Sequence, residues 1–176
     1  MHRAIFLDRD GVINEDSGYL YKWEDFKFLP GVIDALKMFS FDDFLLIIVT
    51  NQSGISRGLY SEADFKALCK EMCGFLKTHG VYIKDIYFCP HMPFHEDEKN
   101  HCQCRKPLPG LILQAADKYN IDLNLSVMVG DKKTDILSGK AAGVGLNVLI
   151  SSVKDDGDIL TFPDLFAFAK YYLPHS

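Results

Sequence analysis

The segment AIFLDRDGVIN, residues 4–14, is the part of the sequence that decides the fold. Its first four residues form a continuous apolar run, which is typical of a strand that is buried on both faces of a parallel sheet. The run stops at Asp8, and Gly11 permits the tight turn that carries the chain out of the strand. A short buried strand that ends in acidic residues predicts an α/β sheet with a ligand site just beyond this strand.

The same alternation continues along the chain. Further apolar runs predict strands at 45–49, 86–88, 127–129 and 146–150. Helical patterns between and after them predict helices at 32–39, 62–78, 110–119, 134–142 and 165–172, with Ser61 as the N-cap of the second. We therefore expect an α/β fold, a doubly wound parallel sheet with helices on both faces. The chain length fits one domain over 1–176 without a large cap domain.

Composition and charge exclude several classes of function. The chain carries 19 basic and 24 acidic residues, a net charge of −5, which argues against a nucleic-acid partner. The longest apolar run, Phe44–Val49, is far shorter than the about 20 residues that a membrane-spanning helix needs. The first residues show no signal-type segment. We expect a cytoplasmic monomer that acts on a small molecule.

Polar residues follow several of the predicted strands, where an open α/β sheet binds its ligands. They are Asp8-Arg9-Asp10, Thr50-Asn51-Gln52-Ser53, Arg105-Lys106 and Gly130-Asp131. Crowded carboxylates need a cation to stay ionised, and hard oxygen ligands suit Mg²⁺. A hydroxyl and a lysine beside that metal suit phosphate oxygens. These segments together predict a site for phosphoryl transfer.

The spacing of Asp8 and Asp10 suits a two-step hydrolysis. Side chains two residues apart in an extended segment lie on the same side. Asp8 can then attack phosphorus and form an acyl-phosphate, while Asp10 protonates the leaving oxygen and later deprotonates water. Mg²⁺ and Lys106 are expected to neutralise the charge that develops on the transferred group.

Cysteine and histidine residues concentrate in the loop 89–104. Cys89, His91, Cys102 and Cys104 provide the four ligands that a structural Zn²⁺ requires, and a polar loop without a core of its own gains order from such a metal. The loop leads directly into Arg105-Lys106, so zinc would position these cations without joining the chemistry. His95 or His101 as substitute ligands, and reduced thiols without metal, are the alternatives.

In order, these motifs resemble those of the haloacid dehalogenase (HAD) phosphatases, and within them the D,D-heptose 1,7-bisphosphate phosphatases and the related histidinol phosphatases. The resemblance rests on residues 8–14, 50–54, 102–107 and 130–135. It implies that Asp8 is the nucleophile and Asp10 the acid and base. It also implies that Asp8, the main-chain carbonyl of Asp10, and Asp131 hold Mg²⁺, that Thr50 and Lys106 stabilise the phosphoryl group, and that the cysteine loop carries a structural zinc.

Substrate contacts are also expected from the resemblance. They comprise Arg9, Asp16, Ser17, Gly18, Tyr19, Asn51, Gln52, Ser53, Arg57, Arg105 and Lys132. The resemblance leaves Asp135 either as a member of the site or as a helix cap.

Two segments favour the heptose enzymes over the histidinol phosphatases. The stretch Ser53–Gly58 and the stretch Asp16–Tyr19 are similar to segments of the heptose enzymes. Arg57 suits a second phosphate, which a bisphosphate has and histidinol phosphate lacks. The implied activity is removal of the 7-phosphate of D-glycero-D-manno-heptose 1,7-bisphosphate, on the route to nucleotide-activated heptose for lipopolysaccharide.

Three other functions compete with this interpretation. Histidinol-phosphate phosphatase is the nearest alternative. A phosphoaccepting signalling domain has similar residues, but its aspartate follows the third strand, which here ends in Cys89. An inactive zinc-containing interaction module is the third, and the set of Asp8, Asp10, Lys106 and Asp131 argues against it.

Overall fold

A computed structural model describes residues 1–97, 102–153, 157 and 159–173. Six strands form one parallel sheet with the order β3-β2-β1-β4-β5-β6. The strands are β1 (Arg3–Leu7), β2 (Phe44–Asn51), β3 (Ile83–Cys89), β4 (Val127–Gly130), β5 (Leu146–Ile150) and β6 (Leu160–Phe162). The strand order reverses between β1 and β4, so the sheet is doubly wound, as predicted.

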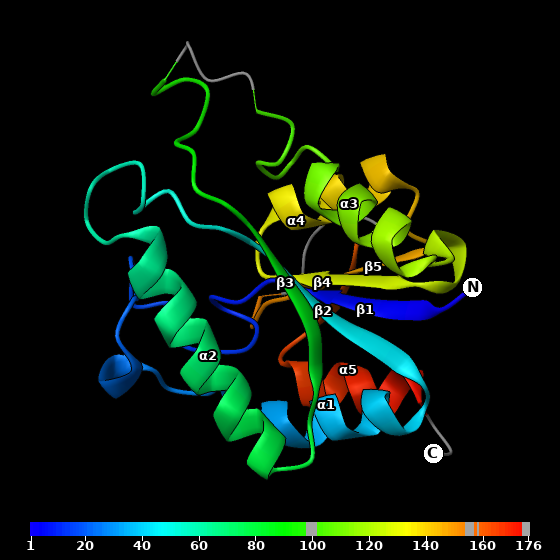
Figure 1. The fold of residues 1–176 in the computed structure, drawn as a ribbon. Coiled ribbons are helices and arrows are strands. Elements are labelled where there is room, and N and C mark those ends of the chain that lie inside the picture. The colour runs from blue at the N-terminus through cyan, green and yellow to red at the C-terminus, as the bar shows by residue number, and fades with distance from the viewer. Residues whose placement is uncertain (98–101, 154–156, 158, 174–176) are drawn as a thin grey trace.

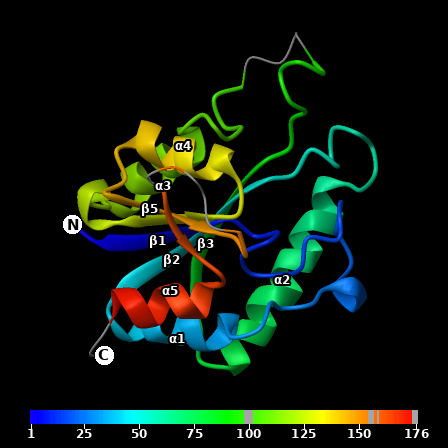
Figure 2. The same cartoon turned by 180° about the vertical axis from the view of Figure 1, so that it is seen from behind.

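Helices cover both faces of the sheet. They are α1 (Val32–Phe41), α2 (Glu62–Thr78), α3 (Gly110–Tyr119), α4 (Lys133–Ala142) and α5 (Leu165–Tyr172), with single 3₁₀ turns at Trp23–Asp25 and Leu123–Leu125. Figure 1 shows α3 and α4 on one side of the sheet and α1, α2 and α5 on the other, and Figure 2 shows the same layers from behind. No helix in the described part of the chain is both long enough and apolar enough to cross a bilayer.

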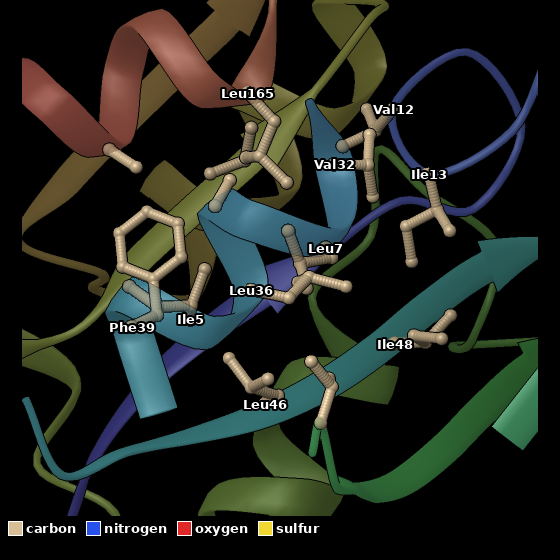
Figure 3. Close-up of a cluster of buried hydrophobic side chains, with 14 of the residues drawn as sticks. Ile5, Leu7, Val12, Ile13, Val32, Leu36, Phe39, Leu46, Ile48 and Leu165 are labelled. Carbon is tan, nitrogen blue, oxygen red and sulfur yellow. The ribbon is translucent and has the colours of Figure 1, made fainter. Parts of the chain in front are cut away.

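The core follows from the two-residue period of the strands. Ile5 and Leu7 of β1 face α1 and α5, where they pack with Leu36 and Leu165 (Figure 3). Phe6, between them in the sequence, faces the opposite side and packs in the cluster that includes α3 residues. Because successive side chains of a strand point to opposite faces, one apolar run supplies both layers of the core.

The predicted elements agree closely with the structure. The helices at 62–78, 110–119 and 165–172 have the predicted bounds, and each predicted strand is present. The strand β6 was not predicted, because it has only three residues, with the polar Thr161 in the middle. Residues 98–101 of the cysteine loop, including the alternative ligand His101, lie outside the described residues.

The beginning of α2 is fixed by a capping box. Asp64 N donates to Ser61 Oγ at 3.1 Å, and Ser61 N donates to Asp64 Oδ2 at 2.8 Å. The prediction that Ser61 is the N-cap is therefore confirmed. This cap also fixes the residues just before it, which belong to the loop that follows β2.

Candidate active site

A cavity of about 500 Å³ lies beyond the carboxyl ends of the strands. Segments that follow β1 and β2, the end of the cysteine loop and the start of α4 contribute to its wall. The lining residues are Asp8, Asp10, Asp16, Gly18, Tyr19, Asn51, Gln52, Ser53, Tyr60, Arg105, Lys106, Lys132, Thr134 and Asp135. The strand order reverses beside β1, and a doubly wound sheet binds ligands at this point.

The buried ammonium group of Lys106 joins two carboxylates at the floor of this cavity. Its Nζ donates to Asp8 Oδ1 at 2.8 Å and to Val49 O at 2.7 Å, and it lies 2.6 Å from Asp135 Oδ1. Burial lowers the pKa of Lys106, but the charges of Asp8 and Asp135 outweigh this effect and raise it. The lysine is therefore a fixed positive charge within the cluster of carboxylates.

Asp8 is nearly enclosed by protein. Burial raises its pKa, and the neighbouring Lys106 opposes that rise. The carboxylate remains beside a fixed cation, so a nucleophilic oxygen and a charge-stabilising group are already in contact. This is the arrangement that attack on an anionic phosphoryl group requires.

Asp131 brings another carboxylate to the same place. Burial and the nearby Asp8 raise its pKa to about 7. Its Oδ1 is buried and has no hydrogen-bond partner among the described residues. Carboxylate oxygens of Asp8, Asp131 and Asp135 lie within 4.8 Å of one another. An unpartnered buried oxygen in a group of hard oxygen donors fits a Mg²⁺ ion.

Hydrogen bonds hold Asp10 from several sides. Arg9 Nη2 donates to Asp10 Oδ1 at 2.9 Å, and Asn14 Nδ2 donates to the same oxygen at 2.9 Å. Gln52 Nε2 donates to Asp10 Oδ2 at 3.0 Å. Both carboxylate oxygens are therefore oriented before substrate binds, which suits a group that must transfer a proton along a defined direction.

Asn51 connects β2 with the segment that carries the lysine. Lys106 N donates to Asn51 Oδ1 at 3.1 Å, and Asn51 Nδ2 donates to Lys106 O at 3.2 Å. These two hydrogen bonds place Lys106 against the end of β2. The peptide between Lys106 and Pro107 is cis.

Cys89, His91, Cys102 and Cys104 form a compact cluster. The Sγ atoms of Cys89 and Cys102 are 3.8 Å apart, and His91 Nδ1 lies 3.4 Å from Cys89 Sγ and 3.5 Å from Cys104 Sγ. Tetrahedral zinc, with bonds of about 2.3 Å to sulfur and 2.0–2.1 Å to nitrogen, gives separations of about 3.8 Å and 3.5 Å. The four donors therefore fit a Zn²⁺ ion. Arg105 Nη1 donates to His91 O at 2.9 Å, so the cluster is tied to the cavity wall.

Comparisons with known proteins identify the family. A model of HAD-like hydrolases matches residues 103–164. A heptose 1,7-bisphosphate phosphatase from B. bronchiseptica, solved with magnesium and phosphate, is 31% identical, with a TM-score of 0.84 and coverage of 99% of both chains. The D-glycero-β-D-manno-heptose-1,7-bisphosphate 7-phosphatase of Yersinia pestis is 46% identical over 86% of this chain and 81% of its own. The chain belongs to the heptose-1,7-bisphosphate 7-phosphatase family.

Members of this family act on different anomers. The enzyme of Escherichia coli strain K12, named for the β-anomer, is 46% identical over 86% of this chain and 80% of its own. The enzyme of Campylobacter jejuni, named for the α-anomer, is 42% identical over 89% of this chain and 87% of its own. These relatives are phosphatases of the HAD superfamily, and the chain is accordingly a phosphoric monoester hydrolase.

Most of the residues that were predicted for a heptose phosphatase site come together. Eleven of them line the cavity: Asp8, Asp10, Asp16, Gly18, Tyr19, Asn51, Gln52, Ser53, Arg105, Lys106 and Lys132. Thr50 is buried beside it and accepts a hydrogen bond from Gln52 Nε2 at 2.9 Å. Asp131 lines the neighbouring cavity, which also contains Gly11.

Three predicted substrate contacts lie elsewhere. Arg9 is fully buried, and its guanidinium group contacts Asp10 and Leu20 O. Ser17 lines a separate cavity that is formed by residues of the 15–27 segment. The guanidinium of Arg57 forms an ion pair with Glu96 of the cysteine loop and lies 6.0 Å from the ring centre of Tyr19.

Three residues of this region were not predicted from the sequence. Tyr60 and Thr134 line the cavity, and Asn14 holds Asp10. Tyr60 lies in a loop and Thr134 in the first turn of α4. Neither residue type carries a signal of its own in such a place, because its role depends on a partner that is distant in the sequence. The sequence left Asp135 either as a member of the site or as a helix cap. In the structure its Oδ1 contacts Lys106, and its Oδ2 accepts from Lys132 N at 3.0 Å at the beginning of α4.

Proposed function

We propose that this protein removes the 7-phosphate of D-glycero-D-manno-heptose 1,7-bisphosphate through a phosphorylated Asp8. The observation that carries the proposal is the contact of Asp8 with Lys106 in a cavity that also contains the oriented carboxyl group of Asp10. The names of the relatives support the substrate, since they include both anomers of this bisphosphate.

The first step transfers the phosphoryl group to the enzyme. A carboxylate oxygen of Asp8 attacks phosphorus, and the bond from phosphorus to the sugar oxygen breaks. Asp10, protonated at this stage, gives its proton to the leaving oxygen, so the sugar departs as an alcohol. Lys106, together with the hydroxyl of Thr50, stabilises the negative charge on the transferred group.

The second step regenerates the enzyme. Asp10, now a carboxylate, takes a proton from a water molecule, and the oxygen of that water attacks phosphorus. The bond between Asp8 and phosphorus breaks, and inorganic phosphate is released. The hydrogen bonds from Arg9, Asn14 and Gln52 keep Asp10 in place for both proton transfers.

Asp8, the main-chain carbonyl of Asp10, and Asp131 are the proposed ligands of Mg²⁺. When bound, this ion would neutralise charge on the phosphoryl oxygens and keep Asp8 and Asp131 ionised. The unpartnered Oδ1 of Asp131 supports this assignment. We assign Asp135 to Lys106 and to the cap of α4, because both of its oxygens already have partners.

The cluster of Cys89, His91, Cys102 and Cys104 is the proposed structural zinc site. Its spacing supports this role, and Arg105 Nη1 connects the cluster to the substrate cavity through His91 O. Because the thiols must be reduced to bind metal, the proposed location is the cytoplasm. We further propose that the chain is a single domain that acts as a monomer on the route to nucleotide-activated heptose.

Arg57 is the proposed contact of the second phosphate. Its guanidinium lies beside Tyr19, which lines the cavity, and is paired with Glu96. A bisphosphate would offer this arginine a stronger anionic partner than a single carboxylate. The variant Arg57→Ala should therefore lose rate on the bisphosphate relative to a sugar monophosphate. An unchanged ratio of the two rates would contradict the role.

A side-by-side assay of phosphate release tests the proposed function. The purified protein with Mg²⁺ is given both anomers of heptose 1,7-bisphosphate, histidinol phosphate and simple sugar phosphates. We expect many turnovers and the highest kcat/KM for one heptose anomer. Preference for histidinol phosphate would favour that phosphatase activity instead. Stoichiometric phosphorylation without turnover would contradict the enzymatic function.

A further inference from the structure

Tyr60 lies at the wall of the cavity, outside the set of residues that the reaction itself uses. Its ring is buried, and its hydroxyl donates to Gln52 Oε1 at 2.6 Å. The capping box at Ser61 begins directly after it, so its backbone is held by the start of α2. The position of this hydroxyl is therefore fixed by the fold before any substrate arrives.

The Gln52 side chain is fully engaged by three neighbours. Its Nε2 donates to Asp10 Oδ2 at 3.0 Å and to Thr50 Oγ1 at 2.9 Å, and its Oε1 accepts from Tyr60. An amide group has two donor hydrogens on nitrogen, and both are used here. Gln52 is also almost completely buried, so a lost partner would leave a polar atom without water to replace it.

The orientation of this amide depends on the partner at each end. With the opposite orientation, Oε1 would face the carboxylate of Asp10, and two acceptors would repel each other. At the other end, the Tyr60 hydroxyl donates to Oε1 and stabilises the observed orientation. Burial raises the pKa of Tyr60 to about 12, so this hydroxyl keeps its proton throughout the physiological range. Nε2 is thereby directed at both Asp10 and Thr50.

Two further contacts hold the Tyr60 ring. Tyr21 stacks on it with ring centroids 5.4 Å apart and planes 13° apart. On its edge, the ring passes so close to Gly54 that a Cβ added there would lie 2.2 Å from Tyr60 Cε1. The absence of a side chain at residue 54 is therefore required for this placement of the ring.

We propose that Tyr60 is a positioning residue for proton transfer by Asp10, acting through the amide group of Gln52. The amide shares the orientation of Asp10 Oδ2 with Arg9 Nη2, which donates to the same oxygen at 3.1 Å. The amide also leaves the hydroxyl proton of Thr50 available to another acceptor. This proposal rests on the proposed role of Asp10 as acid and base. It also assigns Gln52, which was expected among the substrate contacts, to the support of Asp10 and Thr50.

The test compares two classes of phosphate ester in the variant Tyr60→Phe. Each kcat/KM reports the reaction up to phosphorylation of Asp8. A sugar phosphate has a poor leaving group that needs a proton from Asp10, whereas p-nitrophenyl phosphate has a good leaving group that does not. We expect kcat/KM for the sugar phosphate to fall about tenfold and that for the aryl phosphate to fall less than about threefold. The ratio of the two values is independent of the fraction of correctly folded enzyme.

Two companion variants sharpen the test. Tyr21→Phe removes a hydroxyl from the stacked ring without touching Gln52, and it should leave both kcat/KM values unchanged. Gly54→Ala should displace the Tyr60 ring and lower the sugar-to-aryl ratio as Tyr60→Phe does. An equal loss on both esters, or no loss on either, in Tyr60→Phe would overturn the proposal. Turnover of heptose bisphosphate by the unmodified protein is measured separately, so failure of the proposed function would be recognised by itself.

Discussion

Lys106 Nζ lies 2.8 Å from Asp8 Oδ1, so the loop after β3 places a buried cation against the carboxylate that directly follows β1. Replacement by methionine keeps much of the side-chain volume but removes the charge. We expect Lys106→Met to lower kcat by about 10²–10³-fold, because charge on the transferred group loses its fixed partner. Lys118→Met is the control, since Lys118 pairs with Asp85 far from the cavity. A kcat within threefold of the original for Lys106→Met would contradict this role.

The close approach of Gly11 to Asp131 predicts a defect in magnesium binding. A Cβ on Gly11 would lie 2.3 Å from Asp131 Oδ2, so Gly11→Ala should displace that carboxylate. We expect the Mg²⁺ concentration for half-maximal activity to rise at least about tenfold.

Gly143→Ala is the matched control for the backbone effect. Both glycines have φ +85, but Gly143 has no atom within 4 Å of an added Cβ. This variant should lose about 1–2 kcal/mol of stability, because a Cβ is strained in the left-handed region, and it should retain its magnesium dependence. The same dependence in both variants would show that Gly11 does not act through Asp131.

The cysteine cluster predicts a link between zinc content and stability. We expect Cys102→Ser to lose most of its zinc and to lower the Tm by roughly 5 °C or more, because the loop loses its metal crosslink. Metal analysis and calorimetry measure both quantities. Cys73→Ser, outside the cluster, should keep its zinc. Full zinc occupancy in Cys102→Ser would refute the ligand assignment.

Asp85 of β3 accepts hydrogen bonds from Lys118 and Tyr119 of α3. These contacts predict that the stability of the fold depends on pH. Burial raises the pKa of this carboxyl, but hydrogen bonds from Lys118 and Tyr119 outweigh it and hold the pKa below its usual 3.8. The folded state therefore favours the ionised form, and the stabilisation is present above pH 3.8 and lost as the pH falls below it.

Denaturation of the unmodified protein and of Asp85→Asn at several pH values measures this effect. We expect a difference in the free energy of unfolding of about 1 kcal/mol at pH 7, modest because the group is partly exposed. The difference should shrink as the pH falls toward 3. A difference that stays constant over this range would mean that the carboxylate charge is not involved.

Most strands and helices were predictable because each depends on a pattern of neighbouring residues in the sequence. Continuous apolar runs indicated the buried strands. Polar residues after these runs indicated the edge of the sheet where the cavity lies. The placement of Asp8 and Asp10 at the same cavity was predictable because both directly follow one buried strand. The clustering of Cys89, His91, Cys102 and Cys104 was predictable because few residue types can bind zinc and these four are concentrated in one loop.

The remaining parts depend on contacts between distant residues. Glu96, which pairs with Arg57 across 39 positions, and Tyr60, which reaches Gln52, have ordinary local surroundings. Arg9 is buried and donates to Asp10, a contact that its place in the sequence does not predict. Composition and spacing do not encode which polar group meets which, because packing of the whole fold decides it.

The proposed mechanism requires Asp8 to carry the phosphoryl group during turnover. The reaction is quenched in acid at steady state, the protein is treated with borohydride to reduce acyl-phosphates, and the modified residue is located by mass spectrometry. We predict that Asp8 is reduced to homoserine and that Asp8→Asn neither turns over nor shows this product. Modification at another residue, or turnover without a modified residue, would contradict this mechanism.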